Sequence, residues 1–547
     1  MRGLMQDYPL TIDSIFRRAE TLYPDRELVS AGSPGGTVGP LRTNYGEWAQ
    51  RTRRLGGVLN TLGVSADGRV ATFAWNSTRH LELYFAAPCT GRVLHALNIR
   101  LFPEQLTYIA NHAGDEVVFV DRSLLGMLAP LLPSMPSITN VVVMDDGAGP
   151  EPAELSVDTA QVHDYEELLA QCDPVDFAIT DEYRAAAMCY TSGTTGNPKG
   201  VVYSHRSTWL HSMAANTTSA RGAGETDTVL PIVPMFHANA WGLAQAAPMT
   251  GAGLVFPGSD MSPEALLKLM VEEKVTVAAG VPTIWTAMRP LLKDVQLPAL
   301  RTIICGGSAV PQALSEYYRT TVGVPMLQAW GMTETHPLAT VAHVAARDAD
   351  ASDTEKAELR ARQGTPVPGI ELRIVEPGTT TPLPWDDQAS GELQVRSPWA
   401  GADYYKPDEG VELSTEDGWM KTGDVACIDQ FGNVRLVDRT KDLVKSGGEW
   451  ISSVELENEI MAHPGVAEAA VIGVPHPKWD ERPIACVVRA EGATVSAEEL
   501  LEHLRPRVAK WWLPDAIEFI DEIPKTSVGK FSKKDLRSKF TDYALPG

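Results

Sequence analysis

Residues 190–200 read Tyr-Thr-Ser-Gly-Thr-Thr-Gly-Asn-Pro-Lys-Gly, directly after the apolar run from Ala185 to Cys189. The glycines allow a tight turn and expose backbone N–H groups, the hydroxyl side chains add donors, and Lys199 adds a positive charge. A strand followed by such a loop suits a polyphosphate ligand. The spacing excludes a Walker P-loop, because Lys199 follows a proline and not a glycine. The alternative interpretation is a polar surface turn.

On both sides of this loop, short apolar runs alternate with helical patterns. Apolar residues at helical spacing predict one helix behind Thr11, from Ile12 to Leu22, and another from Trp48 to Leu62. Strands that alternate with helices over the first 340 or so residues indicate parallel α/β layers. The predicted strands are Val70 to Trp75, Val117 to Val120, Val141 to Met144, Leu230 to Val233, Thr276 to Ala279 and Arg301 to Cys305.

The pattern changes near Gly369, where closely spaced strands with period-two alternation predict a small antiparallel β subdomain. After Asp438 a separate α+β pattern follows, about one hundred residues long. The sequence therefore predicts an α/β protein with two domains. Residues 1–438 form layered α/β subdomains plus the small β subdomain, and residues 439–547 form the α+β C-terminal domain. The predicted elements of these last regions are strands at Glu371 to Val375, Glu392 to Arg396, Asn433 to Val437, Ala469 to Ile472, Ile484 to Arg489 and Ile517 to Ile520, and helices from near Val454 and over Ser496 to Val508.

Composition narrows the function classes. The 547 residues contain 70 Asp and Glu against 47 Lys and Arg, a net charge of −23, which argues against a nucleic-acid-binding surface and general affinity for anionic membranes. The six cysteines include no C-x-x-C pair, so neither a disulfide framework nor a zinc site is expected. No signal-peptide pattern and no apolar stretch of about 18 residues is found. We expect a cytoplasmic protein with no integral membrane association and no nucleic-acid partner.

The string at 190–200 resembles the phosphate loop of the adenylate-forming superfamily, which includes acyl- and aryl-CoA synthetases, nonribosomal peptide adenylation domains and firefly luciferases. Four further segments resemble the family's later motifs in the expected order. They are the adenine and magnesium motif Trp330-Gly-Met-Thr-Glu334-Thr, the ribose motif Thr422-Gly-Asp424, the hinge Asp438-Arg-Thr-Lys441-Asp442, and the catalytic-lysine loop Pro524-Lys-Thr-Ser-Val-Gly-Lys530. The resemblance spans essentially the whole chain, and it is strongest to bacterial medium- and long-chain fatty acyl-CoA synthetases.

The resemblance implies an acid–thiol ligase that works in two half-reactions. A carboxylate attacks the α-phosphorus of ATP to give acyl-AMP and pyrophosphate, and the thiol of CoA then displaces AMP. ATP/AMP, Mg²⁺ and CoA are the implied cofactors, and a small-molecule carboxylic acid is the substrate. A homodimer, as in some relatives, is compatible with the short N-terminal extension.

For the first half-reaction, the resemblance implies that Glu334 and Thr191 bind Mg²⁺ and that Lys530 contacts the carboxylate and the α-phosphate. Trp330 would stack on adenine, and Asp424 and Arg439 would contact the ribose. We expect Lys533 and Lys534, beyond Lys530, on a solvated face. The implied nucleotide-binding residues are Thr191, Ser192, Gly193, Thr194, Thr195, Gly196, Lys199, Gly307, Ser308, Ala329, Trp330, Gly331, Met332, Thr333, Asp424, Arg439 and Lys441.

For the second half-reaction, the resemblance implies that the C-terminal domain rotates about Lys441. Rotation would withdraw Lys530 and bring the segment Lys445-Ser-Gly-Gly-Glu-Trp450 to the nucleotide. Lys445 and Trp450 would then contact AMP. Gly447 and Gly448 would leave space for the pantetheine arm of CoA.

The segment Met235-Phe-His237-Ala238-Asn-Ala-Trp241 resembles the wall of the acyl tunnel. By resemblance, His237 backs the carboxylate, Ala238 lines the tunnel and Trp241 closes it until ATP binds. Residues 235–243 and 279–285 contain no Lys, Arg, Asp or Glu, so an apolar acid is favoured.

Two departures from the family pattern keep other acids open. His336-Pro337 stands where relatives often carry Ser-Pro, and Trp330 replaces the tyrosine that is common in long-chain enzymes. A short thioether or aryl acid is therefore the alternative substrate. An amide-forming enzyme with an amine acceptor, a luciferase-like oxygenase and a catalytically silent ligand sensor are the alternative functions. A silent sensor would have lost Lys530 or Glu334, and both are present.

Overall fold

The computed structural model describes residues 1–33, 39–149, 159–191, 197–220, 222–293, 295–447, 449–525, 531–541, 543 and 545. Contacts divide the chain into two compact units. The first unit contains Met1–Gly193, Asn197–Ile370 and Arg396–Met420, and the second contains Thr194–Gly196, Glu371–Val395 and Lys421–Gly547. The domain boundary expected after Asp438 stays a prediction.

The first unit contains a nine-stranded sheet in the order β16-β15-β14-β13-β12-β10-β11-β1-β2. Its central strands, from β14 to β1, run parallel, and β2, β15 and β16 pair antiparallel at the two ends. The strands are β1 Glu27–Ser30, β2 Leu41–Asn44, β10 Thr228–Pro231, β11 Gly253–Phe256, β12 Val277–Gly280, β13 Thr302–Cys305, β14 Met326–Gly331, β15 Leu338–Val341 and β16 Thr365–Pro366.

A seven-stranded sheet of the same unit has the order β7-β6-β5-β3-β4-β8-β9. All its pairs are parallel except β8 with β9. Strands such as Val141–Met144 are continuous apolar runs because both faces of the sheet are covered. The strands are β3 Arg69–Phe73, β4 Val93–Ala96, β5 Asp115–Asp121, β6 Asn140–Met144, β7 Gln161–Asp164, β8 Ala185–Tyr190 and β9 Gly200–Ser204.

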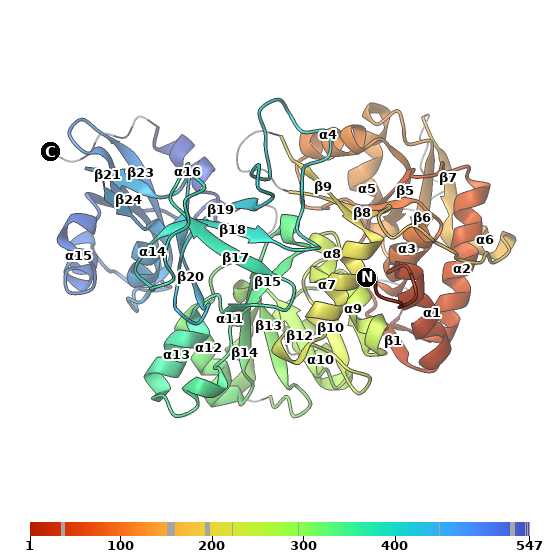
Figure 1. Cartoon of the computed structure of the whole chain (residues 1–547), viewed down its shortest axis with the longest axis horizontal. Helices are drawn as coiled ribbons and strands as arrows, with labels where there is room; N and C mark the ends of the chain where they lie inside the picture. The colour runs from red at the N-terminus through yellow and green to blue at the C-terminus, as the bar shows by residue number, and fades with distance from the viewer. Residues whose placement is uncertain are drawn as a thin grey trace. The chain divides into compact units, whose positions relative to one another are not determined.

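Helices cover these two sheets, and α1, α2, α3 and α6 pack side by side (Figure 1). Asn44 caps α2 by accepting a hydrogen bond from the Glu47 N–H at 2.9 Å. The helices of the first unit are α1 Ile12–Leu22, α2 Tyr45–Thr61, α3 Thr78–Cys89, α4 Pro103–Ala113, α5 Leu125–Leu128, α6 Tyr165–Gln171, α7 His205–Ala215, α8 Ala238–Trp241, α9 Leu243–Thr250, α10 Pro263–Glu272, α11 Pro282–Met288, α12 Gln312–Tyr317 and α13 Asp353–Ala361.

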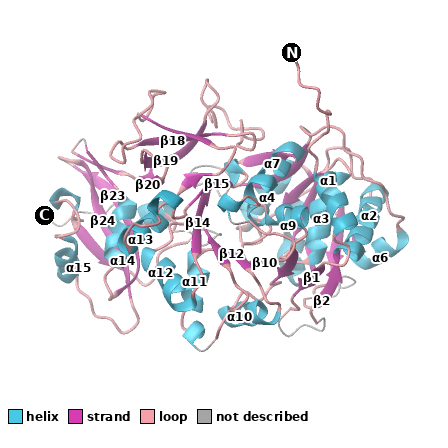
Figure 2. Ribbon diagram, turned by 60° about the horizontal axis from the view of Figure 1, so that its bottom comes forward, coloured by secondary structure: helices cyan, strands magenta, loops and turns pink. Residues whose placement is uncertain are grey.

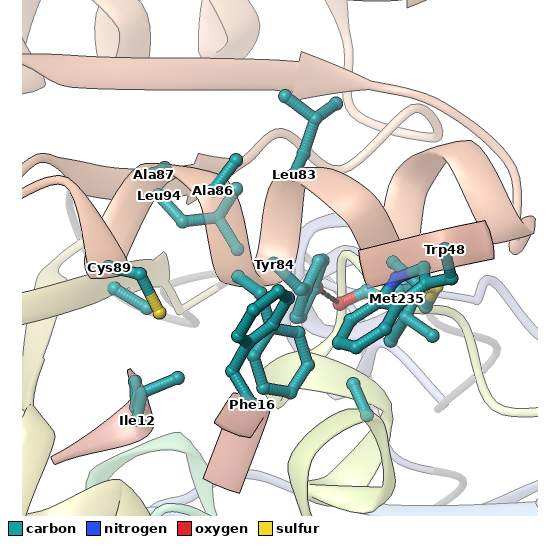
Figure 3. Packing of buried hydrophobic residues seen from close by; sticks show 14 of the residues in the cluster. Ile12, Phe16, Trp48, Leu83, Tyr84, Ala86, Ala87, Cys89, Leu94 and Met235 are labelled. Carbon is teal, nitrogen blue, oxygen red and sulfur yellow. Dashed lines mark hydrogen bonds between the residues drawn. The ribbon is translucent and has the colours of Figure 1, made fainter. Parts of the chain in front are cut away.

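The main core of the first unit includes apolar residues of α1, α2 and α3 and of strands from both sheets. Trp48 is fully buried and its ring lies 5.0 Å from the rings of both Phe16 and Phe85. The Tyr84 hydroxyl, also fully buried, donates a hydrogen bond to the Met235 carbonyl (Figure 3). The core therefore holds the start of the segment 235–241, which the sequence assigns to the acyl tunnel.

The second unit contains a four-stranded sheet, β17-β18-β19-β20, and a five-stranded sheet in which β22, β21, β24 and β23 are consecutive and β25 pairs with β24. Separate apolar clusters lie on the two faces of the β23–β24 pair. The elements are β17 Glu371–Val375, β18 Gly391–Arg396, β19 Met420–Ile428, β20 Val434–Arg439, β21 Val444–Ser446, β22 Glu449–Ile451, β23 Val466–His476, β24 Asp480–Arg489, β25 Ala516–Phe519, α14 Ser453–Met461, α15 Ala497–Leu504 and α16 Lys533–Lys539.

The predicted fold class is confirmed, since parallel strands alternate with helices through the first unit and α+β elements follow (Figure 2). The helix expected over Ser496 to Val508 is shorter and ends at Leu504, because Pro506 has no backbone N–H to continue the helical hydrogen bonds. The described cysteines, Cys89 to Cys486, are all free thiols. Within the described ranges, no helix has the length and apolar character needed to cross a bilayer.

Candidate active site

The ends of the loop at 190–200 form the last rung of an antiparallel strand pair. β8 ends at Tyr190, β9 begins at Gly200, and these two residues face each other. The Thr191 N–H donates to the Lys199 carbonyl at 2.9 Å, so the loop leaves and re-enters the sheet at neighbouring points. This is a strand–loop–strand arrangement. The predicted phosphate-binding residues Ser192, Gly193, Thr194, Thr195 and Gly196 lie outside the described residues.

A polar network lies beside the base of this loop, and its exposure falls from Lys406 to the buried His95 and Asp115. The Tyr190 hydroxyl is 2.7 Å from His112 Nδ1, and His112 Nε2 donates to the Lys406 carbonyl at 3.2 Å. The His95 ring lies 5.1 Å from the Tyr190 ring and is hydrogen-bonded to Asp115 at 2.8 Å, with both side chains fully buried. Burial raises the pKa of Asp115, and His95 partly opposes this. The network fixes the start of the loop.

Glu334 lies in a short turn, Thr333–Thr335, just after β14. Its side chain is buried, and Oε1 accepts a hydrogen bond from the Tyr404 hydroxyl at 2.7 Å. Its carbonyl accepts from the Gly401 N–H at 2.7 Å. Among the described residues, the other carboxylate oxygen accepts no hydrogen bond. A buried carboxylate whose second oxygen accepts no hydrogen bond from the described residues can coordinate Mg²⁺. Mg²⁺ in proteins binds through one or two carboxylates together with substrate phosphates.

Lys199 and Glu334 both contact Tyr404. The Lys199 ammonium lies 4.9 Å from the centre of the Tyr404 ring, within cation–π range. The structure therefore brings the predicted phosphate lysine and the predicted metal carboxylate to one aromatic side chain. Among the described residues, Lys199 and Glu334 form no ion pair with each other.

The predicted adenine and acyl segments also meet. A side chain on Gly306 would lie 2.6 Å from the Ala329 carbonyl and 3.5 Å from the Trp241 ring, and one on Gly307 would lie 3.7 Å from the same ring. Trp330 is buried on β14, next to Ala329. The Trp241 ring thus lies over the glycine pair. Of the remaining predicted residues, Ser308 follows β13, Gly331 ends β14, and Met332 and Thr333 come directly after β14.

Trp241 ends a left-handed turn. Its four residues Ala238, Asn239, Ala240 and Trp241 have φ between 43° and 57°, and Gly242 follows at 77°. Left-handed geometry costs roughly 1–2 kcal/mol for each residue with a Cβ. The Asn239 side chain, which is buried, accepts from the Cys189 thiol at 3.4 Å. Such strain concentrates at functional sites, where packing holds it. His237 is half-buried at the start of this turn.

His336, the departure from the family pattern, is buried in a ring stack. Its imidazole lies 3.8 Å from the Tyr203 ring and 5.1 Å from the His211 ring, nearly parallel to both. The peptide bond to Pro337 is cis. Burial lowers the pKa of His336 well below its usual range, and burial lowers the pKa of His211 to about 3. Both rings are therefore neutral at physiological pH.

In the second unit, Asp424 and Arg439 face each other across β19 and β20 and form an ion pair at 2.6 Å. The structure thus brings the two predicted ribose residues together. Lys441 is exposed in the turn after β20, and its carbonyl accepts from Arg537 of α16 at 3.3 Å.

Lys445 and Trp450 face each other in the β21–β22 hairpin, so their side chains share one face of it. Both are exposed, and the Lys445 ammonium lies 3.5 Å from Asp480. Gly447 occupies the hairpin turn, and its N–H donates to the Trp479 carbonyl at 2.8 Å. Gly448 lies outside the described residues.

Lys530 also lies outside the described residues. The expectation of a solvated face was wrong for Lys533, whose side chain is only 11% exposed and pairs with Glu457 at 2.6 Å. The reason is that the start of α16 packs against β23 and places Lys533 beside α14. Lys534 is exposed, as expected.

Sequence reasoning missed three aromatic residues of this region: Tyr404, Tyr203 and His112. Tyr203 donates a hydrogen bond to the Thr333 carbonyl at 2.7 Å and so holds the turn that carries Glu334. The signal for Tyr404 is an aromatic pair, Tyr404 and Tyr405, within a segment of Gly, Asp and Pro. No local pattern marks Tyr203 or His112.

Comparisons with known proteins show the family of the chain. The family model of the AMP-binding enzyme matches residues 16–405, and that of the AMP-binding enzyme C-terminal domain matches residues 455–530. The chain is 44% identical over 550 residues to a 3-methylmercaptopropionyl-CoA ligase of Ruegeria lacuscaerulensis, covering 100% of both chains. It is also 44% identical over 544 residues to a long-chain-fatty-acid–CoA ligase of Thermus thermophilus, covering 98% of this chain and 97% of the relative.

Among solved structures, ATP-bound MatB from Rhodopseudomonas palustris is similar, with a TM-score of 0.82 and 28% identity over 97% of this chain and 99% of that one. The two family models include the loop at 190–200, the motif at 330–335 and the loop that ends at Lys530, and the Ruegeria relative covers the whole chain. The chain therefore belongs to the AMP-binding enzyme family, the adenylate-forming superfamily to which the ordered motifs pointed.

Proposed function

We propose that this enzyme is an AMP-forming acid–thiol ligase that converts an apolar carboxylic acid to its CoA thioester through an acyl-AMP intermediate. The observation that carries the proposal is that Lys199 and Glu334 meet at one residue, Tyr404. A cation at the end of a phosphate loop and a buried carboxylate both contact Tyr404. Adenylation needs this combination, because two anions must meet and their charge must be offset.

In the first half-reaction, Lys199 and the loop N–H groups bind the phosphates, with Glu334 and Thr191 as metal-binding residues. When bound there, Mg²⁺ would offset the charge of the triphosphate and stabilise the charge that develops at the α-phosphorus. Trp330 provides a flat surface for adenine, and Asp424 and Arg439 bind the ribose hydroxyls. Lys530 supplies the positive charge next to the attacking carboxylate, and His237 backs that carboxylate.

In the second half-reaction, Lys445 and Trp450 bind AMP from one face of their hairpin, while Gly447 and Gly448 leave room for pantetheine. Residues 1–438 and 439–547 are the two domains in this proposal, with Lys441 as the hinge. The acceptor is CoA, because the complete segment from Lys445 to Trp450 is present.

The acid we propose is a medium- or long-chain fatty acid, since residues 235–243 and 279–285 offer no Lys, Arg, Asp or Glu to a charged substrate. A short thioether acid is the second candidate. It is favoured by the Ruegeria relative, which is named a 3-methylmercaptopropionyl-CoA ligase and is as similar as the Thermus enzyme. It is also favoured by the buried polar ring of His336, in place of a serine, two residues after Glu334.

The test is pyrophosphate release with ATP and Mg²⁺ across carboxylic acids from short to long, including thioether and aryl acids, each with and without CoA. A fatty acyl-CoA ligase gives its highest kcat/KM with medium or long chains and turns over only with CoA. A maximum with a thioether acid selects the second candidate. Release that an added amine accelerates in the absence of CoA overturns the acceptor, and no release with any acid overturns the proposal.

A further inference from the structure

The segment 400–406, which we call the strap, contacts two predicted parts of the ATP site within the first unit. At one end, the Gly401 N–H donates to the Glu334 carbonyl. At the other end, the Tyr405 N–H donates to the Gly200 carbonyl at 2.8 Å, and the Lys406 carbonyl accepts from His112. The strap is therefore anchored by backbone bonds to the turn that carries Glu334 and to the base of the phosphate loop.

Tyr404 lies between these anchors and is the residue of the strap whose side chain reaches both charges. Its hydroxyl donates to Glu334 Oε1 at 2.7 Å, and its ring lies 4.9 Å from the Lys199 ammonium. Tyr404 and Lys199 are half-buried, and Glu334 is 6% exposed. A salt bridge between Lys199 and Glu334 would satisfy both groups without any ligand, yet the described residues contain no such pair. One aromatic side chain holds the two opposite charges separately instead.

We propose that Tyr404 is a positioning residue for adenylation: its hydroxyl orients the Glu334 carboxylate and its ring holds the Lys199 ammonium, so that neither charge neutralises the other before ATP binds. This inference rests on the proposed function. The hydroxyl occupies one carboxylate oxygen and leaves the other for a cation, which is the role of outer-shell partners around metal ligands. The ring face attracts the ammonium without offering a counter-charge, so Lys199 stays available to a phosphate.

Two substitutions separate the two roles. Tyr404→Phe keeps the ring under Lys199 and removes only the hydroxyl from Glu334. Tyr404→Leu removes both. A matched control is Tyr317→Phe on α12, because the Tyr317 hydroxyl donates to the Arg289 carbonyl at 3.2 Å and its ring lies 4.5 Å from the Arg289 guanidinium. This control loses the same kind of contact away from the strap.

The main readout is equilibrium binding of ATP to the full-length protein by calorimetry, with and without Mg²⁺ and without any acid. We expect Tyr404→Phe to bind ATP without Mg²⁺ as the wild type does. In this variant, the Mg²⁺ concentration that gives half of the Mg²⁺-dependent gain in ATP binding should rise about ten- to a hundredfold, which is the usual effect of losing an outer-shell partner of a metal ligand. We expect Tyr404→Leu to weaken ATP binding in the absence of Mg²⁺ as well. Pyrophosphate release should show the same shift in Mg²⁺ dependence, with kcat recovered at saturating Mg²⁺ for Tyr404→Phe.

The proposal is overturned if Tyr404→Phe has the Mg²⁺ dependence of the wild type. It is equally overturned if both variants lower ATP binding to the same extent with and without Mg²⁺ while their thermal midpoints fall, because Tyr404 would then have a purely structural role. Failure of the proposed function is a different result. In that case the wild-type protein releases no pyrophosphate with any acid, whereas the ATP-binding measurements still report on Tyr404.

Discussion

A substitution of Lys445 should affect only the second of the two half-reactions. It is exposed on the hairpin face that it shares with Trp450. We predict that Lys445→Ala lowers thioester formation by about ten- to a hundredfold, since a hydrogen bond to a charged group contributes about 1.5–3 kcal/mol. Acyl-AMP formation is retained. Pyrophosphate release and thioester formation, measured in parallel, check this, and an unchanged CoA-dependent rate would contradict the role of Lys445.

Lys530 is predicted to act on the other half-reaction. Lys530→Ala should reduce pyrophosphate release by about 10²–10³-fold, because a positive charge directed at a developing oxyanion contributes about 2.7–4 kcal/mol. The variant should still convert added acyl-AMP and CoA to thioester. Near wild-type pyrophosphate release would contradict the role of Lys530. Lys534→Ala serves as the charge-matched control, because Lys534 is an exposed lysine on α16.

At the scale of an element, the left-handed turn over Ala238–Trp241 depends on the glycine that follows it. Gly242 has φ 77°, and a Cβ there would lie 2.4 Å from the His211 ring. We predict that Gly242→Ala destabilises the first unit by more than the 1–3 kcal/mol of a strained backbone alone, because the clash adds to it. Urea unfolding followed by tryptophan fluorescence gives the change.

Gly63 provides the control for this turn. Its φ is 70°, and a Cβ there would meet no heavy atom within 4 Å. Gly63→Ala therefore carries the backbone strain without the clash. If the two alanine variants lose equal stability, the expected clash between a Cβ at position 242 and the His211 ring does not contribute.

At the scale of the whole molecule, buried neutral histidines couple stability to pH. The pKa of His211 is lowered to about 3 by burial, whereas an unfolded histidine titrates near pH 6.5. Above that pH the ring is neutral in both states and its contribution to stability is fully present. As the pH falls below 6.5, the unfolded chain takes up a proton that the folded chain does not, so stability is lost down to the folded pKa.

His211→Phe removes the imidazole that takes up this proton in the unfolded chain. Between pH 7.5 and pH 5, we predict that the variant loses about 2 kcal/mol less unfolding free energy than the wild type, since the 1.5 pH units below 6.5 each contribute about 1.4 kcal/mol. Urea titrations of both proteins at the two pH values measure the difference. Parallel losses would show that His211 is not neutral in the folded protein.

Much of the fold follows from local sequence. The apolar runs at 117–120 and 141–144 predict buried parallel strands, and the structure has them as β5 and β6. Boundaries were less predictable: β23 extends from Val466 to His476, well beyond the predicted Ala469 to Ile472, because it is paired with β24 along its whole length. Strand ends are set by the partner strand, which a single segment does not encode.

The family of this protein follows from the sequence alone, because the phosphate loop and the four later motifs are contiguous strings that are legible without the fold. Only the tertiary structure decided how Tyr404 meets both Lys199 and Glu334, how four residues before Gly242 turn left-handed, and how His336 stacks between Tyr203 and His211. The physical reason is range. Periodicity and turn chemistry act over about ten neighbouring residues. Tyr404 instead lies 70 residues from Glu334 in the sequence. Their contact forms only when the fold brings the segment 400–406 next to the turn after β14.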